Sequence, residues 1–343
     1  MAEQGKPGFG ADFTPHMILQ HYQDGHWGPA DVVPFGPFTL SPSSVVFHYG
    51  QEIFEGFKAY RQPDGAVCLF RPEQNLQRLN RSAERLRMPQ VDVPATLHAI
   101  ERLVQVDHDR VPERPNTLYI RPCMFATDTV IKVSPSSRYI FCIMSCVVGD
   151  YFAGTDSRGV RLRTETEYTR AATGGTGFAK CGGNYAASLA AQGQAAQEGF
   201  DQVVWLDAKT HTHVEEMGGM NIMFVLGDVL TTPALGSGTI LPGVTRDSLL
   251  TLARSLGRKV EERDLSCAEL RAAFQQGTLQ EAFACGTAAV VTPIRELVHK
   301  GEVLYQNKGD RPGALTLQLR QHLMDLQFGT APDPLSWRRN VPL

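Results

Sequence analysis

The sequence predicts a mixed α/β protein built from two domains. Its 343 residues exceed what one hydrophobic core usually organises, and 42% of them are hydrophobic, enough to bury a large core. The predicted strands and helices are interspersed without the regular alternation of a barrel or a doubly wound sheet. Hydrophobic periodicity is lost over residues 150–159, which is typical of a linker. We therefore expect a small N-terminal α/β domain over residues 1–150, a linker over 151–159 and a larger C-terminal domain over 160–343.

The N-terminal domain is predicted to combine short strands with two helices. Turn-rich sequence extends to Pro42, and β-branched and aromatic runs then indicate strands. The expected strands cover 45–49, 54–60, 66–70, 117–125 and 138–148. Pro72 suits the first turn of a helix that ends before Pro89, and a second helix covers about 94–106. The apolar stripe of the first helix consists of Leu76, Leu79, Ala83 and Leu86.

The C-terminal domain is predicted to begin with a strand at 160–165 and to continue with further strands and helices. The expected strands cover 202–206, 214–226, 229–232, 283–292 and 302–306. The expected helices cover 184–197, 246–256 and 313–327. Thr245 is a suitable N-cap for the middle helix, which ends at Gly257.

Composition and charge exclude several classes of function. A formal net charge of −3 gives no electrostatic basis for binding nucleic acid or an anionic membrane. The N-terminus lacks the apolar core of a signal peptide, and the longest apolar run, 139–148, is about half of the ~20 residues of a membrane span. The seven cysteines contain no Cys-x-x-Cys pair, so we expect no disulfide framework and no metal site. These features are typical of a cytoplasmic protein.

Lys180 is the most informative residue of the chain. It lies between two glycine pairs in the loop 173–185, next to the apolar Phe178 and Ala179. Glycines let a bulky partner approach the backbone, and a partly desolvated lysine becomes an amine nucleophile. The loop matches neither the Walker nor the Rossmann spacing. The loop therefore indicates a lysine that forms a Schiff base. Taken alone, however, it also fits a glycine-rich surface loop.

Three further segments carry complementary chemistry. An acidic residue on the apolar strand 214–217 is costly unless it faces a cation, and strand alternation lets only one of Glu215 and Glu216 do so. The segment 239–247 places a glycine and a threonine at a helix start, which favours a phosphate. Arg121 lies within a buried strand and needs an anion. An amine, a carboxylate and a phosphate cradle are what pyridoxal phosphate requires, and the arginine suggests an acidic substrate.

At this point the chain resembles a branched-chain amino acid aminotransferase of the fold type IV pyridoxal phosphate family. The resemblance extends from about Phe9 to Pro293. Its motifs, in order, are FEGFKA (54–59), FRP (70–72), YIRP (119–122), GGNY after Lys180, E-x-G-x-M-N (216–221), LPGVTR (241–246) and CGTAA (285–289). The family implies a small N-terminal α/β domain, a larger domain with a pseudo-barrel sheet, a site between the domains, and a homodimer.

The resemblance implies a role for each matching residue toward pyridoxal 5'-phosphate. Lys180 would bind the cofactor covalently and then move a proton during the reaction. Glu216, rather than Glu215, would keep the pyridine nitrogen protonated. Tyr185 would hydrogen-bond the phenolic oxygen, and Leu241 would pack on the ring. The phosphate would be held by Arg78, Gly243, Val244, Thr245 and Thr287.

On the substrate side, the resemblance implies a pocket that accepts leucine, isoleucine and valine and then glutamate. Its apolar wall would come from Phe9, Phe54, Tyr151 and, from the partner subunit, Ile131 and Val133. Arg121, Tyr49 and Tyr119 would bind the side-chain carboxylate of glutamate, and the backbone of Thr287 and Ala288 the α-carboxylate. The reaction would be a reversible, ping-pong transfer between these L-amino acids and 2-oxoglutarate.

Two departures and three rival functions accompany this interpretation. Ala289 and Thr292 replace the redox cysteines of animal members, so thiol regulation there is not expected, and Gly219 replaces a threonine of some members. D-amino acid aminotransferases and aminodeoxychorismate lyases share the lysine and the phosphate cradle. A non-catalytic binder of the cofactor or of a phosphorylated metabolite is the remaining alternative, although binding alone does not need an electron sink.

Overall fold

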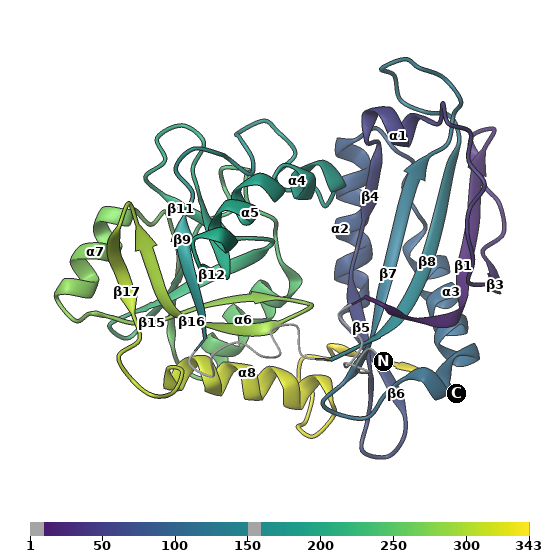
Figure 1. Cartoon of the computed structure of the whole chain (residues 1–343). Helices are drawn as coiled ribbons and strands as arrows, with labels where there is room; N and C mark the ends of the chain where they lie inside the picture. Colours follow the sequence, from purple (N-terminus) through teal and green to yellow (C-terminus); the bar gives the residue numbers. More distant parts are fainter. Residues whose placement is uncertain (1–9, 150–158, 343) are drawn as a thin grey trace, which may run out of the picture. The chain divides into compact units, whose positions relative to one another are not determined.

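A computed structural model describes residues 10–149 and 159–342 and groups them into two compact units (Figure 1). The first unit takes the described residues before 154 together with 179–182 and those from 325 onward, and the second takes the remainder. Residues 179–182, which include Lys180, thus belong to the first unit, whereas the chain on either side of them belongs to the second. The predicted linker, 151–159, lies outside the described residues except for Gly159. Within the described ranges, none of the helices has the length and apolar character to cross a membrane.

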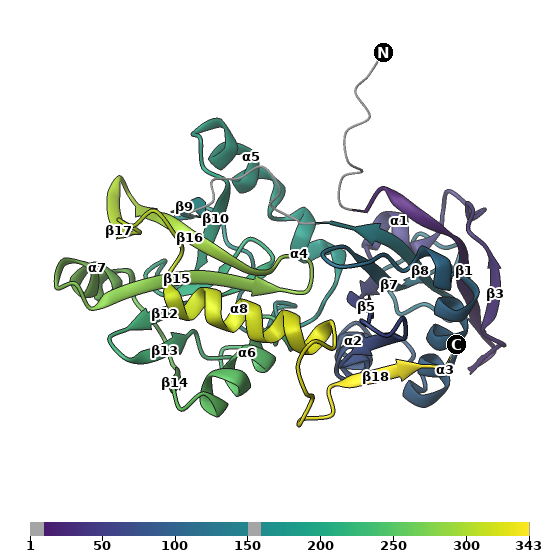
Figure 2. The same cartoon turned by 90° about the horizontal axis from the view of Figure 1, so that it is seen from below.

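The first unit is organised around a nine-stranded sheet. Its strands are β1 (Asp12–Gln23), β2 (His26–Trp27), β3 (Asp31–Pro34), β4 (Glu52–Phe54), β5 (Phe57–Arg61), β6 (Val67–Phe70), β7 (Thr117–Ala126), β8 (Tyr139–Val148) and β18 (Arg338–Val341). They run in the order β18-β6-β5-β7-β8-β1-β2, with β3 paired to β1 and β4 paired to β7. The C-terminal strand β18 pairs with β6 and runs beside α3 (Figure 2), which places the end of the chain in this unit.

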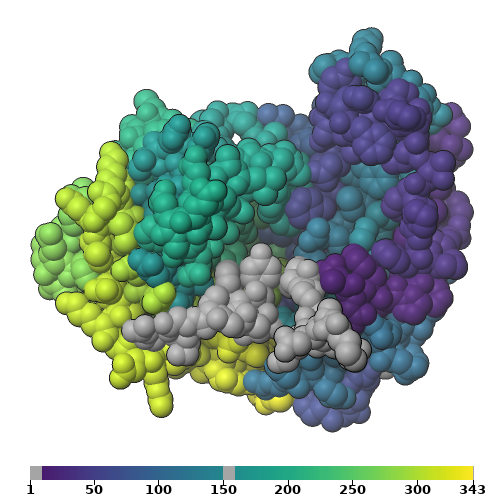
Figure 3. All heavy atoms as spheres, viewed as in Figure 1, coloured from purple at the N-terminus to yellow at the C-terminus, as the bar shows by residue number. Residues whose placement is uncertain are grey.

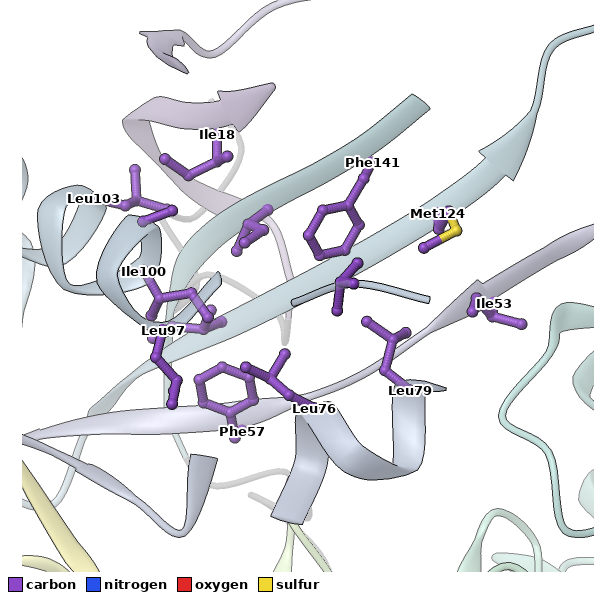
Figure 4. Close-up of a cluster of buried hydrophobic side chains, with 14 of the residues drawn as sticks. Ile18, Ile53, Phe57, Leu76, Leu79, Leu97, Ile100, Leu103, Met124 and Phe141 are labelled. Atoms are coloured by element: carbon purple, nitrogen blue, oxygen red, sulfur yellow. The ribbon is translucent and has the colours of Figure 1, made fainter. Parts of the chain in front are cut away.

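Two long helices cover one face of this sheet. The helices of the unit are α1 (Val45–Tyr49), α2 (Pro72–Arg85), α3 (Val93–Val106) and the short 3-10 helix η1 (His108–Arg110). Leucines of α2 and α3 pack against the sheet side chains Phe57, Met124 and Phe141 in one buried cluster (Figure 4). This burial of a continuous apolar face stabilises the fold and fixes α2 against β4 and β5.

The second unit contains another nine-stranded sheet, which closes on itself. Its strands are β9 (Val160–Thr164), β10 (Gln202–Leu206), β11 (Val214–Met217), β12 (Met220–Leu226), β13 (Val229–Thr232), β14 (Lys259–Glu262), β15 (Leu279–Gly286), β16 (Val290–His299) and β17 (Glu302–Gln306). Strands β11, β10, β9, β16, β15 and β12 form a closed ring, because β12 pairs with β11 as well as with β15. The pseudo-barrel expected from the family resemblance is therefore confirmed.

Helices surround this second sheet. They are α4 (Gly182–Ala186), α5 (Leu189–Gln197), α6 (Val244–Ser255), α7 (Cys267–Gln275) and α8 (Ala314–Gln327). The alanine-rich segment predicted as one helix is thus two. Glu281 of β15 accepts hydrogen bonds from the backbone N–H groups of Leu315 and Thr316, which fixes the start of α8.

Other sequence predictions of local structure were also wrong. The predicted strands 54–60 and 214–226 are each two strands, β4 with β5 and β11 with β12. Three further segments differ for a physical reason. The β-branched segment 45–49 is a single helical turn, because Gly50 adopts a left-handed φ of 59° and its N–H bonds to Val46. The run 283–292 is two strands joined by a turn at 287–289, and its small apolar residues made it look continuous. The N-cap of α6 is Gly243 instead of Thr245, which lies inside the helix.

Candidate functional site

The lysine loop is held in place through its backbone. The N–H of Lys180 donates to Oγ of Ser82 on α2 at 2.9 Å. Its carbonyl oxygen accepts from the N–H of Phe54 on β4 at 3.0 Å. Two residues later, the N–H of Gly182 donates to the carboxylate of Glu52. A glycine-rich segment without regular structure is thereby given a fixed path, and the lysine side chain projects from an anchored position.

The amine of Lys180 lies against an aromatic ring shared with an arginine. Its Nζ is 4.7 Å from the centre of the Phe54 ring, and the guanidinium carbon of Arg121 lies 4.7 Å from the same ring. Nη2 of Arg121 donates to the hydroxyl of Tyr119 at 3.1 Å. Because Tyr119 and Arg121 are two residues apart on β7, they share one face of the sheet, as predicted. An amine, an apolar ring and an anion-binding group therefore meet at one place.

Near the lysine lies a buried ion pair. Nε and Nη2 of Arg78 donate to the two oxygens of Glu55 at 2.7 and 2.9 Å, and both side chains are buried. Asn75 and the N–H of Gly56 complete the hydrogen bonds to that carboxylate. Burial alone raises the pKa of Glu55, but the charge and hydrogen bonds of Arg78, with a contribution from Lys180, hold its pKa below the ordinary value. The guanidinium of Arg78 is consequently fixed in one orientation.

In the second unit, the buried carboxylate of Glu216 forms an ion pair with an arginine, as Glu55 does in the first unit. Its Oε2 lies 3.1 Å from Nε of Arg170, and its Oε1 accepts from the N–H of Leu241 at 2.5 Å. Nη2 of Arg170 donates to the carbonyl oxygens of Gly177 and Thr239 at 2.9 and 2.8 Å. Arg170 thus joins the glycine-rich loop to the segment before α6. Sequence reasoning missed it, because it lies in a polar stretch without periodicity.

The two neighbouring carboxylates of β11 have different partners, at a point where the pairing with β10 is irregular. Glu215 accepts from the Thr239 hydroxyl at 2.5 Å, whereas the ion pair with Arg170 is made by Glu216. Burial raises the pKa of Glu215, and the hydrogen bond from Thr239 counteracts that rise only in part. The ion pair with Arg170 therefore distinguishes Glu216 from Glu215.

The start of α6 and a neighbouring turn offer backbone groups to an anion. Gly243 precedes the helix, and Oδ1 of Asn221 occupies the space that a Cβ of Gly243 would need. The first N–H groups of α6, at Val244 and Thr245, have no partner within the helix and lie at the positive end of its dipole. Val290, the first residue of β16, has a φ of 61°, a strained conformation for a β-branched residue. It directly follows the turn at 287–289, which contains Thr287 and Ala288.

Tyr185 and Gly219 pack closely within the second unit. A Cβ on Gly219 would lie 3.3 Å from the Tyr185 ring, closer than most such contacts. The glycine that replaces the threonine of some family members therefore leaves room for this ring. Tyr185 is half-buried in α4, where its carbonyl oxygen accepts from the hydroxyl of Ser188 at 2.6 Å.

Comparison with known proteins identifies the family. The model for amino-transferase class IV matches residues 52–297. Branched-chain-amino-acid transaminase 1 of Bacillus subtilis (strain 168) is 48% identical over 97% of this chain and 94% of that protein. The chain belongs to the class IV aminotransferases. Among solved structures, the branched-chain amino acid aminotransferase of Escherichia coli has a TM-score of 0.78 and 27% identity over 96% of this chain and 100% of that one. The T.th. branched-chain amino acid aminotransferase complexed with N-(5'-phosphopyridoxyl)-L-glutamate has a TM-score of 0.76. It is 26% identical, over 99% of this chain and 100% of that one.

Class IV aminotransferases depend on pyridoxal phosphate, as expected from the sequence, and the residues of this family member fit that cofactor. The half-buried lysine is a nucleophile for an aldehyde, and the buried carboxylate paired with Arg170 is an acceptor for a pyridinium N–H. The helix start, whose glycine admits no side chain, offers backbone N–H donors to a phosphate. Across residues 10–149 and 159–342, no group of three or more histidine, cysteine and acidic side chains is placed to hold a metal ion.

The predicted substrate wall is only partly assembled within the first unit of this aminotransferase. Phe54, Tyr119 and Arg121 come together, whereas Phe9 and Tyr151 lie outside the described residues. Tyr49 ends α1 and is 39% exposed. The exposed side chains at the surface near α1 are Phe47, Val130, Ile131 and Val133. Ser44, which precedes α1, forms a bridge with Thr129. Figure 3 shows the chain around α1 and the loop after β7 next to each other on the surface.

Proposed function

We propose that the protein reversibly moves the amino group between L-leucine, L-isoleucine or L-valine and 2-oxoglutarate by a ping-pong mechanism. The observation that carries this proposal is the Phe54 ring, which has the amine of Lys180 on it and the guanidinium of Arg121 beside it. An apolar surface next to one arginine suits a pocket that accepts an aliphatic side chain and then a carboxylate. The B. subtilis relative is named for branched-chain amino acids, and the T.th. structure holds a glutamate derivative.

The residues that would hold the cofactor are those that the family resemblance implies. When bound, pyridoxal phosphate supplies the electron sink that stabilises negative charge at the substrate's Cα. Lys180 would hold it covalently, and the amine of Lys180 would move a proton during the reaction. Glu216, which pairs with Arg170, would accept the N–H of the pyridine ring. Tyr185 would donate to the phenolic oxygen. The ring and phosphate would be held by Leu241, Gly243, Val244, Thr245, Thr287 and Arg78.

Substrate binding divides between the apolar wall and two anion sites. Phe54, with Phe9 and Tyr151, contacts the aliphatic side chain, and in a homodimer the wall is completed by the partner's Ile131 and the partner's Val133. Arg121, with Tyr119 and Tyr49, binds the side-chain carboxylate of glutamate. The backbone N–H groups of Thr287 and Ala288 bind the α-carboxylate. The high exposure of Ile131 and Val133, at 68% and 82%, supports burial in an assembly.

A direct test uses the visible spectrum of the cofactor-loaded protein without any 2-oxo acid. Excess L-leucine should convert the yellow form to the colourless pyridoxamine form. If D-leucine or D-alanine does so and L-leucine does not, the protein is a D-amino acid aminotransferase. A yellow band that no amino acid changes would favour a lyase or a binding protein, and turnover with any amino acid excludes the latter.

The Arg121→Gln substitution should separate the two substrates. We expect KM for 2-oxoglutarate to rise about 10- to 100-fold, because a hydrogen bond to a charged group contributes about 1.5–3 kcal/mol. KM for leucine should change much less, since leucine brings no side-chain carboxylate. Steady-state kinetics with both substrates measures the difference. Arg102→Gln removes an exposed arginine as the control, and equal rises in both KM values would contradict the assignment.

The Glu216→Gln substitution should lower kcat about 100-fold, an effect typical of losing one electrostatic contact to a reacting group. Its neighbour provides a matched control, because Glu215 is also buried on β11 but bonds to the Thr239 hydroxyl, whereas the ion pair with Arg170 belongs to Glu216. Glu215→Gln keeps an acceptor for Thr239 and should leave kcat within a few fold. A similar loss in both variants would mean that the strand, and not the Glu216 carboxylate, is what the reaction needs.

A further inference from the structure

The hydroxyl of Ser82 connects the predicted catalytic lysine to the helix that carries Arg78. Ser82 is fully buried on α2. Its Oγ accepts from the N–H of Lys180 at 2.9 Å and donates to the carbonyl oxygen of Arg78 at 3.1 Å. A hydroxyl has one proton to donate and lone pairs to accept, so both contacts are made together. A serine on a buried helix face thereby accepts a hydrogen bond from the backbone of the lysine loop.

The contacts continue into a closed ring. Arg78 pairs with Glu55 through two hydrogen bonds at 2.7 and 2.9 Å. Glu55 follows Phe54 in the chain, and the N–H of Phe54 donates to the carbonyl oxygen of Lys180 at 3.0 Å. Both backbone polar groups of Lys180 are therefore fixed, one through α2 and one through β4. The lysine and the arginine belong to one connected network, although they lie far apart in sequence.

We propose that Ser82 is a positioning residue that holds the Cα of Lys180 in register with Arg78. This inference rests on the proposed function, in which the lysine amine binds the cofactor and then moves a proton while its backbone stays in place. A displacement of about 1 Å at a reacting group lowers rates by as much as about 100-fold. Without the Ser82 hydroxyl the N–H of Lys180 loses its acceptor on α2, and the amine samples positions that do not lead to reaction.

The test compares Ser82→Ala with Asn80→Ala in the full-length protein. Asn80 lies on the same helix, and its side chain makes two 2.9 Å hydrogen bonds to the backbone of Val91, away from the lysine. Both changes remove buried or half-buried hydrogen bonds from α2. In Ser82→Ala we expect kcat with leucine to fall about 10- to 100-fold and KM to change by less than about threefold. Asn80→Ala should keep kcat close to that of the wild type.

Hydrogen exchange in the cofactor-free protein provides a second readout. The amide of Lys180 should exchange at least about tenfold faster in Ser82→Ala and at the wild-type rate in Asn80→Ala, because only the first variant removes its acceptor. Ser82→Cys, which restores volume with a weak acceptor, should resemble the alanine variant. Unchanged exchange and kcat in Ser82→Ala, or full recovery in Ser82→Cys, would overturn the proposal. If the wild type itself does not turn over leucine, the proposed function fails, while the exchange rates still decide whether Ser82 holds Lys180.

Discussion

Lys180→Ala protein is expected to lose transamination by at least about 1,000-fold. The lysine supplies both a covalent attachment and a proton carrier, and general acid–base catalysis alone contributes about 100- to 10,000-fold. The variant should nevertheless fold, because the contacts that anchor the loop use the backbone N–H and carbonyl of Lys180, which alanine retains. The measurement is kcat with L-leucine and 2-oxoglutarate at saturating pyridoxal phosphate.

An exposed lysine gives the control for this experiment. Lys209 lies in the turn between β10 and β11, so Lys209→Ala should keep full activity. The cofactor spectrum adds an independent observation, since Lys180→Ala protein should bind pyridoxal phosphate only noncovalently and release it on dialysis. Retention of more than about a tenth of the wild-type kcat, far above what the loss of acid–base catalysis allows, would exclude Lys180 as the catalytic amine and reopen the choice of function.

Elements with strong local signals were predictable from the sequence. Pro72 and the apolar stripe that follows it predicted α2, and the first residue of the helix was predicted correctly. The long apolar runs of β7 and β8 predicted those two strands. Strand β1 was missed because Pro15 interrupts a polar, turn-like sequence. In the structure the register of β1 shifts between Phe13 and Met17, and such an irregularity is where a strand tolerates proline.

The chemical groups of the site were predictable, but their partners were not. Glycines around Lys180 and an acidic residue in an apolar strand are local signals that a sequence shows directly. Ser82 looks like any helical serine, Glu55 like a strand-end carboxylate, and Arg170 like part of a polar loop. Each acquires its importance from residues distant in sequence, such as Arg78 for Glu55 and Glu216 for Arg170. Only tertiary structure brings those pairs together.

Glu55→Gln should lower the free energy of unfolding by about 3–5 kcal/mol, because breaking a buried ion pair leaves Arg78 buried without a countercharge. Glutamine keeps the size of the side chain and one acceptor, so the loss reports the charge rather than a cavity. Urea denaturation of the cofactor-free protein measures it. Glu84→Gln on the exposed side of α2 is the control and should change stability by less than about 0.5 kcal/mol.

The pH dependence of the same comparison tests the cause. The folded-state pKa of Glu55 is depressed, so its stabilisation is complete above its ordinary value of about 4.3 and is lost as pH falls through the lower folded value. The stability difference between wild type and Glu55→Gln should therefore be constant near neutrality and shrink in acid. A difference that stays the same down to the acid transition would assign the loss to packing instead.

The double variant Glu55→Leu with Arg78→Met separates stability from function at this ion pair. Replacing both charges by apolar side chains of similar volume should recover most of the stability lost in Glu55→Gln, since buried pairs contribute little net stabilisation. It should not recover affinity for pyridoxal phosphate, because the guanidinium proposed to contact the phosphate is gone. A double variant that is stable but binds the cofactor weakly would show that the pair is retained to orient Arg78. Full cofactor affinity in that variant would remove Arg78 from the phosphate site.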